Sequence, residues 1–197
     1  MPSVKDRIKQ FAGGAAINSH LTLGEIGAMK TASGRVHHAF LDPQLVMLPA
    51  KMKIYKFNNY ASLRPDDNGN YTPWWSAYDA YDVDPGWFAK TAMARAFRVS
   101  IRELGRVTSA ITESWNSCEY LATITLKVDI WVMYGRFRQM SRTDAWDSKV
   151  IAGKGAGTRD EGRMKTRNLP GGGRQFYIPN LKRDYFGGET MESLLNR

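Results

Sequence analysis

A single stretch decides the class of fold: Glu119-Tyr120-Leu121-Ala122-Thr123-Ile124-Thr125-Leu126-Lys127-Val128-Asp129-Ile130-Trp131. Apolar and polar side chains alternate in it at every position from 122 to 130. Because successive side chains of a strand point to opposite faces, this alternation predicts one strand over 119–131 with one buried and one polar face. A strand of this kind is typical of an antiparallel or mixed sheet.

Two helices are predicted before this strand. Asp84-Pro85-Gly86 marks the start of the first, with Asp84 as the N-cap and Pro85 at the first helical position. Ser100-Ile101-Arg102-Glu103 has the spacing of a capping box and begins the second helix. The apolar residues expected to face the core are Trp87, Phe88, Met93 and Phe97 in the first helix and Ile101, Leu104, Val107 and Ile111 in the second.

Two shorter strands are also predicted, one before the helical pair and one after the long strand. Residues 52–57 alternate as a strand does, and Gln175–Ile178 combines aromatic and aliphatic residues. Pro179 ends the second of these strands or places it at a sheet edge. Strands on both sides of a helical pair, without βαβ alternation, indicate an α+β fold and argue against a doubly wound nucleotide-binding fold.

The first 48 residues differ from the rest of the chain in their sequence pattern. Apolar residues at helical spacing predict short helices over 4–11 and 21–29, and no pattern there carries chemistry. We therefore divide the chain into a helical N-terminal appendage or linker over 1–48 and an α+β domain over 49–197.

The composition restricts the possible functions. The chain has 197 residues, a formal net charge of +9, one cysteine and three histidines. One cysteine, Cys118, allows neither a disulfide framework nor a cysteine-based zinc site within the chain, and we expect no metal. No apolar run reaches the roughly 18 residues of a membrane span, and the charged N-terminus lacks the apolar core of a secretory signal. The basic charge suits nucleic acid, anionic membranes, acidic partner proteins and phosphate-bearing ligands alike.

A run of three glycines precedes the last predicted strand, in Leu169-Pro170-Gly171-Gly172-Gly173-Arg174-Gln175-Phe176-Tyr177-Ile178. Glycine permits tight turns and close approach of a ligand to the main chain. Two interpretations follow: a plain hairpin turn, or the wall of a site that presents Gln175.

Paired tryptophans occur in Thr72-Pro73-Trp74-Trp75-Ser76, which is predicted as a loop. Large aromatic side chains either pack into a core or stack on a flat ring such as adenine or nicotinamide. The hydroxyls of Thr72 and Ser76 would stand beside such a ring.

These features together resemble the layout of ADP-ribosyltransferase-like bacterial toxins: a strand with Tyr55-Lys56-Phe57, a polar aromatic loop, a helical pair, and a late strand introduced by Pro170-Gly171-Gly172-Gly173-Arg174-Gln175-Phe176. The motif over 169–177 is similar to the one that presents the catalytic glutamine in NAD-hydrolysing toxins of the tuberculosis necrotizing toxin family. The layout covers roughly residues 48–181. The resemblance implies a split antiparallel or mixed sheet, NAD(P) as substrate without a metal, and Gln175 as the catalytic residue.

Two positions depart from the family pattern. Lys56 stands where the family usually carries an arginine that binds the NAD phosphates, and lysine lacks the bidentate fork of arginine. The late strand reads Gln175-Phe176-Tyr177 where transferases of the superfamily usually carry Glu-x-Glu, so no carboxylate there activates an acceptor. Hydrolysis is therefore favoured over transfer. The expected substrate-binding residues are Lys56, Arg64, Thr72, Trp74, Trp75, Ser76, Asn116, Gly173 and Tyr177.

This interpretation predicts a toxin of interbacterial competition that cleaves the nicotinamide–ribose bond of NAD(P). We expect it to enter a target cell without a classical signal peptide, to act in the cytoplasm, and to be held by an acidic immunity protein without a membrane role. Three alternatives remain: a mono-ADP-ribosyltransferase that modifies a protein or RNA, a basic nucleic-acid-binding protein without enzymatic activity, and a structural component of a secretion system or phage.

Overall fold

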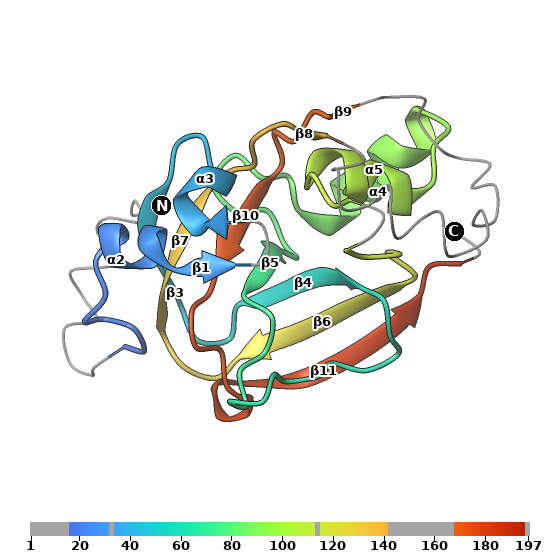
Figure 1. The fold of residues 1–197 in the computed structure, drawn as a ribbon. Coiled ribbons are helices and arrows are strands. Elements are labelled where there is room, and N and C mark those ends of the chain that lie inside the picture. The colour runs from blue at the N-terminus through green and yellow to red at the C-terminus, as the bar shows by residue number, and fades with distance from the viewer. Residues whose placement is uncertain (1–15, 32–33, 113–114, 142–167, 196–197) are drawn as a thin grey trace.

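A computed structural model describes residues 16–31, 34–112, 115–141 and 168–195 of the chain. The helix expected over 4–11 lies outside these residues, as does the whole of the segment 142–167. The described part is a mixed α+β structure built on a seven-stranded sheet in the order β11-β6-β4-β5-β10-β7-β3, with every neighbouring pair antiparallel (Figure 1). The strands are β3 (Gln44–Leu48), β4 (Lys53–Asn58), β5 (Trp74–Ala77), β6 (Tyr120–Leu126), β7 (Ile130–Arg136), β10 (Arg174–Tyr177) and β11 (Phe186–Ser193).

The long strand expected over 119–131 is two strands that do not pair with each other. The chain bends between Leu126 and Ile130, so β6 pairs with β4 and β11, whereas β7 pairs with β3 and β10. The prediction was wrong about continuity because the alternation of apolar and polar residues runs unchanged through the bend. The segment from β3 to β4 bends beside it, and the two bends together divide the sheet into two halves.

Hydrogen bonds between the two bends hold this corner. Lys51 N donates to Leu126 O at 2.7 Å, and Leu126 N donates to Met52 O at 2.9 Å. The carboxylate of Asp129 accepts the backbone N–H of Ala50 at 2.7 Å. Asp129 therefore satisfies a backbone donor that the bend removes from the strand ladder.

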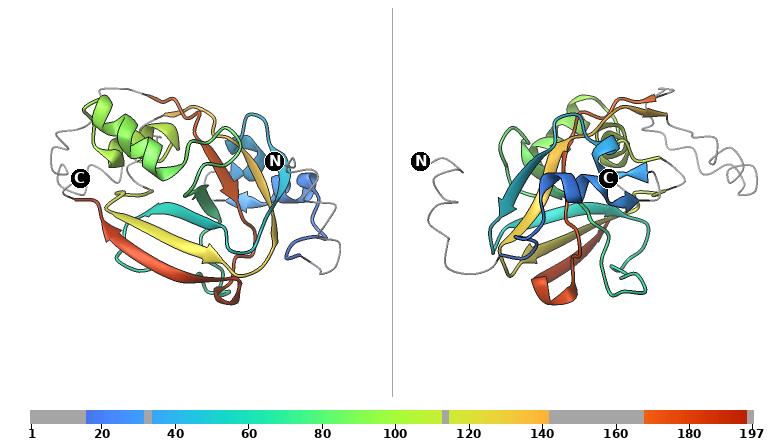
Figure 2. Two further views of the ribbon diagram at one scale, coloured as in Figure 1. Left: turned by 180° about the vertical axis from the view of Figure 1, so that it is seen from behind. Right: turned by 60° about the vertical axis from the view of Figure 1, so that its left-hand side comes forward.

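The described residues form three apolar clusters that pack against the two faces of the sheet. The largest lies between the two halves and includes Ile54, Trp75, Ile124 and Phe176, all fully buried. On the opposite face, α4 (Gly86–Ala96) and α5 (Ile101–Thr108) cover β4 and β6. The short helices α2 (Leu23–Ala28) and α3 (Val36–Ala39) pack beside β7 (Figures 1 and 2).

The helix starts follow local sequence signals. Ser100 Oγ accepts the N–H of Glu103 at 3.1 Å, as expected for the cap of α5. Thr22 and Glu25 form a capping box at α2. The first helix of the predicted pair begins one residue later than expected, because Pro85 is its N-cap, although the carboxylate of Asp84 still accepts the N–H of Gly86 at 2.8 Å.

The buried side of α4 is not the one predicted. Trp87 and Ala94 are buried, whereas Phe88, Met93 and Phe97 are 68%, 41% and 63% exposed. Trp87 and Ala94 are seven residues apart and thus share one helical face, and Lys90 lies between them on it. An inward-facing lysine interrupts the apolar stripe, so hydrophobicity alone selects the wrong face. In α5, by contrast, Ile101, Leu104 and Val107 are buried as predicted, and Ile111 lies beyond the end of the helix.

The segment expected as an N-terminal appendage contributes to the sheet. Residues 44–48 form β3, which pairs with residues 130–134 of β7, and Ile26, Val36 and Phe40 are fully buried in the cluster beside it. The boundary proposed at residue 48 falls at the bend between β3 and β4.

The last predicted strand, β10, is central rather than at an edge, because it pairs with both β5 and β7 and ends before Pro179. The remaining elements are short: β1 (Lys30–Thr31), β2 (Gly34–Arg35), β8 (Met140–Ser141), β9 (Asn168–Leu169) and the 3-10 turn η1 (Arg183–Tyr185). Within the described ranges, no helix has the length and apolar character that crossing a bilayer requires.

The contact between α5 and β4 predicts a large effect of one methyl group. A Cβ at Gly105 would overlap the ring of Phe57, whereas a Cβ at Gly24 of α2 would meet only Thr22 Oγ1 at 3.9 Å. We expect Gly105→Ala to lower the free energy of unfolding by about 1–3 kcal/mol through overpacking. Gly24→Ala should raise it by about 0.5–1 kcal/mol through helix propensity. Urea titration of the two variants measures the difference, and equal stabilities would contradict the packing of α5 on Phe57.

Candidate functional site

A pocket opens where β4 and β5 separate. The two strands pair only at Ile54–Ala77 and Tyr55–Ser76. Beyond that point β4 continues along β6, while Trp74 pairs with Tyr177 of β10. The cavity between them has a volume of about 310 Å³, and the loop after α5 closes one side. It is lined by Thr31, Ala39, Tyr55, Lys56, Phe57, Asn58, Asn59, Thr72, Trp74, Trp75, Ser76, Ser109, Ala110, Ile111, Trp115, Asn116, Phe137 and Gln175.

Most of the site residues expected from the sequence meet in this pocket. Of the ten, seven line it: Lys56, Thr72, Trp74, Trp75, Ser76, Asn116 and Gln175. They come from β4, β5, β10 and two loops that lie far apart in the sequence. The two tryptophans begin β5 instead of lying in a loop, and they divide their roles: Trp75 is fully buried in the core, and Trp74 is half-buried.

Three expected residues do not line the pocket. Arg64 is exposed and its guanidinium lies 4.2 Å from the centre of the Tyr60 ring. Tyr177 is buried behind Trp74, with ring centroids 4.9 Å apart. Gly173 donates its N–H to Thr108 O at 2.8 Å, at the end of α5. Tyr177 and Gly173 therefore support the pocket wall from behind.

The lining residues that the sequence interpretation missed include Tyr55, Phe57, Asn58 and Asn59 of β4 and the turn that follows it, together with Ser109. Of these, only Asn58 carries a sequence signal, because it lies two residues from Lys56 and alternate residues of a strand share a face. Ser109 follows α5 and carries no comparable signal.

A row of three polar side chains crosses the sheet at the pocket. Tyr55 pairs with Ser76, and the register of β5 with β10, continued by one residue, sets Ser76 opposite Gln175. Gln175 is only 7% exposed, and its side-chain amide forms no hydrogen bond to any of the described residues. The amide is therefore open to the cavity, and a polar side chain in this position is a candidate ligand contact.

Lys56 is the one charged side chain among the described lining residues. Burial lowers the pKa of its ammonium to about 8, and no carboxylate in the described part of the chain pairs with it. A half-buried cation without a counter-ion among the described residues favours an anionic ligand.

The asparagine side chains at the mouth of the pocket have structural partners. Asn116 Nδ2 donates to Phe57 O at 2.8 Å, and Asn116 Oδ1 accepts the N–H of Cys118 at 2.8 Å. Asn59 Nδ2 donates to Trp115 O at 3.2 Å, and Asn59 Oδ1 accepts the N–H of Ser117. These bonds fasten the loop to β4, so Asn116 builds the wall and leaves Gln175 and Lys56 as the groups open to a ligand.

The glycine run docks against two other segments before it enters β10. Gly171 N donates to Val107 O at 3.0 Å, and Gly172 N donates to Phe137 O at 3.0 Å. Gly171 and Gly172 have φ values of 69° and 85°, which favour glycine. None of the three glycines lines the pocket, so their role is to turn the chain tightly between α5 and β7 and start β10 at the right register.

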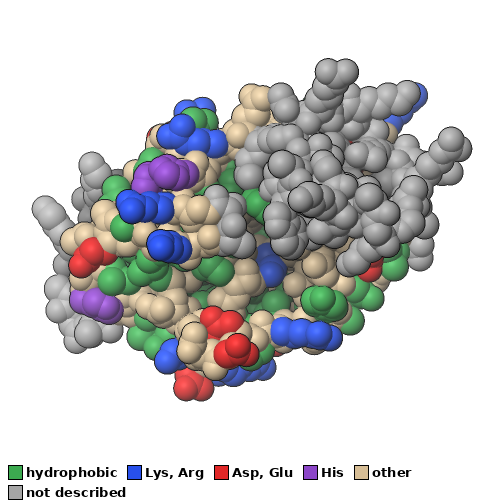
Figure 3. All heavy atoms as spheres, in the orientation of Figure 1, with side chains coloured by type: hydrophobic (Ala, Val, Ile, Leu, Met, Phe, Trp, Pro, Cys, Tyr) green, Lys and Arg blue, Asp and Glu red, His purple; other side chains and the backbone are tan. Residues whose placement is uncertain are grey.

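The pocket thus combines aromatic walls with amides, hydroxyls and one cation. Figure 3 shows the face of the molecule seen in Figure 1, with hydrophobic side chains between the basic and polar ones where described residues are visible. No carboxylate, histidine or cysteine is among the described lining residues. The described parts of the chain contain no cluster of three or more such groups that could hold a metal ion.

Searches against family models, curated proteins and solved structures find no match to this chain. The functional argument below therefore depends on the pocket and on the sequence motifs that build it.

The glycine run provides a matched pair of substitutions. A Cβ at Gly171 would lie 2.6 Å from the carbonyl oxygens of Phe137 and Arg138, whereas a Cβ at Gly172 would meet no atom within 4 Å. Gly172→Ala should lower the free energy of unfolding by about 1–2 kcal/mol, the cost of the left-handed backbone alone. Gly171→Ala should lower the free energy of unfolding by more than this, because the backbone of Phe137 and Arg138 must also move to make room. Chemical denaturation tests this order, and a smaller loss for Gly171→Ala would contradict the docking.

Proposed function

We propose that this chain is a nucleotide-binding enzyme with an ADP-ribosyltransferase-like split sheet, and that its reaction is hydrolysis of the nicotinamide–ribose bond of NAD(P). The observation that carries the proposal is Gln175: a buried amide without a protein partner among the described residues, in a cavity with aromatic walls and one cation. The similarity of residues 169–177 to the glutamine motif of NAD-hydrolysing toxins supports the same assignment.

The proposed reaction requires little acid–base chemistry. The bond between C1′ of the ribose and the ring nitrogen breaks, its electron pair returns to the cationic pyridinium nitrogen, and neutral nicotinamide leaves. The ribose passes through an oxocarbenium-like state, as in glycoside hydrolysis. Water adds its oxygen to C1′ and releases a proton to solvent. Because the leaving group needs no protonation, positioning and electrostatic stabilisation suffice.

Each kind of lining residue has a role in this scheme. The amide of Gln175 holds a ribose hydroxyl or the attacking water. The ring of Trp74, half-buried and supported by Tyr177 and Phe137, offers a flat surface for nicotinamide. Lys56 faces the phosphates. A cavity of about 310 Å³ is at the small end of ligand pockets, so it suits the nicotinamide riboside half, with the adenosine half outside.

Hydrolysis is preferred to transfer because no carboxylate is among the described lining residues to activate an acceptor nucleophile. The rest of the biological setting is part of the proposal: a toxin delivered into a neighbouring cell, active in its cytoplasm, and bound by an acidic immunity protein that matches a formal charge of +9.

Substitution of Gln175 tests the assignment. Gln175→Ala should lower kcat for NAD hydrolysis about 10²–10³-fold, the range found when a single positioned transition-state contact is removed. The matched control is Gln44→Ala, because Gln44 is an exposed strand glutamine of β3 outside the pocket. Chromatography of NAD, nicotinamide and ADP-ribose follows the reaction.

The same assay separates the alternatives. Radiolabel from NAD fixed on a protein or RNA would indicate a transferase. Absence of turnover by the wild-type chain, together with RNA binding that weakens steeply with salt, would contradict the proposal and support a nucleic-acid-binding protein.

The lowered pKa of Lys56 predicts how affinity depends on pH. Below about pH 8 the ammonium is charged and attracts phosphate, and above this value binding must take up a proton. Affinity for ADP-ribose should therefore fall as pH rises from 7 to 9, by at most about tenfold per unit above pH 8.

Calorimetric titration of ADP-ribose at several pH values measures this fall. Lys56→Met should bind weakly at every pH, and Lys56→Arg should keep its affinity to pH 9. A wild-type affinity that stays constant between pH 7 and 9 would remove Lys56 from the phosphate site.

A further inference from the structure

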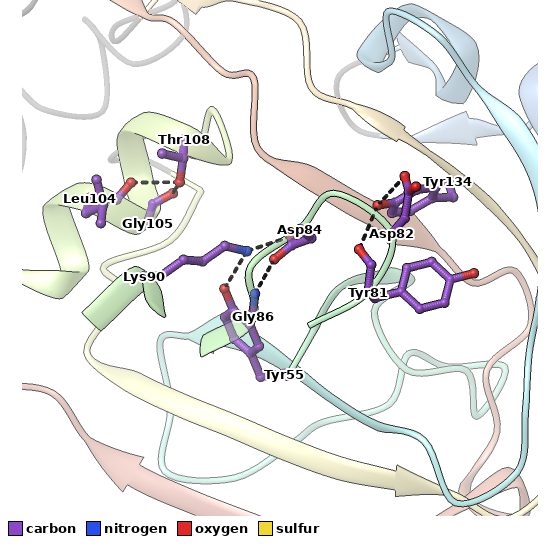
Figure 4. Close-up of polar contacts among 10 residues, drawn as sticks. All are labelled: Tyr55, Tyr81, Asp82, Asp84, Gly86, Lys90, Leu104, Gly105, Thr108 and Tyr134. Carbon is purple, nitrogen blue, oxygen red and sulfur yellow. Dashed lines mark hydrogen bonds and ion pairs between the residues drawn. The ribbon is translucent and has the colours of Figure 1, made fainter. Parts of the chain in front are cut away.

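Lys90 and Lys56 are both partly buried, but the surroundings of their amino groups differ. Lys90 Nζ of α4 lies 2.7 Å from Asp84 Oδ2, and it donates to the hydroxyl oxygen of Tyr55 at 3.3 Å (Figure 4). Lys56 of β4 forms no ion pair or hydrogen bond through Nζ with any of the described residues. The protein therefore neutralises the charge of Lys90, whereas the amine of Lys56 has only the cavity that it lines.

This difference in partners sets the protonation state that each amine prefers. Burial would lower the pKa of Lys90, but Tyr55 and Asp84 outweigh it, so the pKa is raised and the proton stays on. Burial lowers the pKa of Lys56 to about 8. The buried thiol of Cys118 acts against this lowering, but burial raises its own pKa to about 11, so the thiol is neutral near pH 8. At pH 8 about half of the Lys56 side chains are therefore free amines.

The cavity around Lys56 is suited to a flat apolar ligand. The rings of Trp74 and Phe137 line it with their centroids 5.3 Å apart. Its volume of about 310 Å³ is at the small end of ligand pockets, which suits a single ring with a short substituent. Lys56 is fixed within this cavity because its backbone is paired in register with Ala122 of β6. A desolvated lysine in an apolar pocket is the environment in which lysine acts as a nucleophile toward carbonyl groups.

We propose that Lys56 is a covalent binding site for small aromatic aldehydes, which it holds as an imine inside the cavity. The nitrogen lone pair of the free amine forms a bond to the carbonyl carbon, and the carbonyl oxygen takes up the proton that the nitrogen loses. The resulting carbinolamine then loses its hydroxyl group and the second nitrogen proton as water, which leaves a carbon–nitrogen double bond. One amine and one aldehyde thus give one imine and one water, and nothing is oxidised or reduced.

This activity goes beyond the proposed function and does not depend on it. The two use different protonation states of one side chain, because the ammonium of Lys56 attracts phosphate whereas only the free amine attacks a carbonyl. They also use the same cavity, so a bound aldehyde and a bound nucleotide exclude each other.

Reductive trapping of the wild-type chain tests the proposal. Benzaldehyde is the probe, sodium cyanoborohydride converts each imine to a stable secondary amine, and peptide mass spectrometry measures the label at each lysine. At pH 8 fewer than about 1% of lysines with the ordinary pKa of about 10.4 are free amines. Lys56 should therefore be labelled at least about tenfold faster than the exposed Lys51, and Lys90 should stay unlabelled because its proton is held by Asp84.

A neighbour on the same strand is the matched control. Lys53 of β4 is also half-buried, but its Nζ lies 3.8 Å from the centre of the Tyr78 ring and it does not line the cavity. Lys53 should be labelled no faster than Lys51. Labelling of Lys56 at the rate of Lys51 or Lys53 would overturn the proposal. In Lys56→Arg, which keeps a cation but no nucleophilic amine, the fast-reacting position should disappear.

The pH dependence and the choice of aldehyde separate the amine from the cavity. Above pH 8 the free amine of Lys56 approaches saturation while exposed lysines still deprotonate, so the labelling ratio of Lys56 to Lys51 should fall by up to about tenfold per pH unit between pH 8 and 10. A ratio independent of pH would contradict a free amine at Lys56. At pH 8 the ratio should be roughly tenfold higher with benzaldehyde than with propanal, because the ring buries more apolar surface. Equal ratios for the two aldehydes would overturn the preference for an aromatic ligand.

The result can be interpreted without NAD turnover. Selective labelling of Lys56 in a chain that does not consume NAD would support aldehyde binding and reject NAD hydrolysis. NAD turnover together with unselective labelling would overturn aldehyde binding and leave the proposed function intact.

Discussion

The structure depends on the corner at which two neighbouring segments bend together, residues 49–52 between β3 and β4 and residues 127–129 between β6 and β7. Backbone bonds of Lys51 and Met52 with Leu126, and the carboxylate of Asp129 on Ala50 N, replace the strand ladder there. The two sheet halves consequently diverge and enclose a core that contains Trp75, while β4 and β5 share only two residue pairs. The same divergence that forms the core therefore also opens the pocket.

The polar side chains around the pocket differ in whether they have hydrogen-bond partners within the protein. Asn59 and Asn116 bond to backbone atoms and fix the loop beside β4. Gln175 and Lys56 have no such partners among the described residues. Both groups face the cavity, so a ligand that fills it can supply their missing partners. This contrast singles out Gln175 and Lys56 as the candidate ligand contacts of the pocket.

The two helices after β5 connect folding to the site. α5 packs closely on Phe57 through Gly105, and its last carbonyls receive the N–H groups of the glycine run. α4 brings Lys90 to the back of Tyr55. Both helices therefore place groups at the pocket, one by fixing the start of β10 and the other by supplying a paired charge. Stability and site geometry are consequently linked, because loosening either helix shifts a side chain that lines the cavity.

By itself the sequence determined features that depend on neighbouring residues: the cap at Ser100 and the α+β class. A glycine run, a tryptophan pair and a family resemblance also pointed to seven residues that the structure places around one pocket. Only the tertiary structure decided the bend after Leu126, because the strand alternation is the same on both sides of it. It also decided the inward face of α4, where the charge of Lys90 is compensated by Asp84, a partner that no hydrophobic pattern reveals. Long-range pairing sets both outcomes, since the partners of a bent strand and of a buried charge lie on other elements.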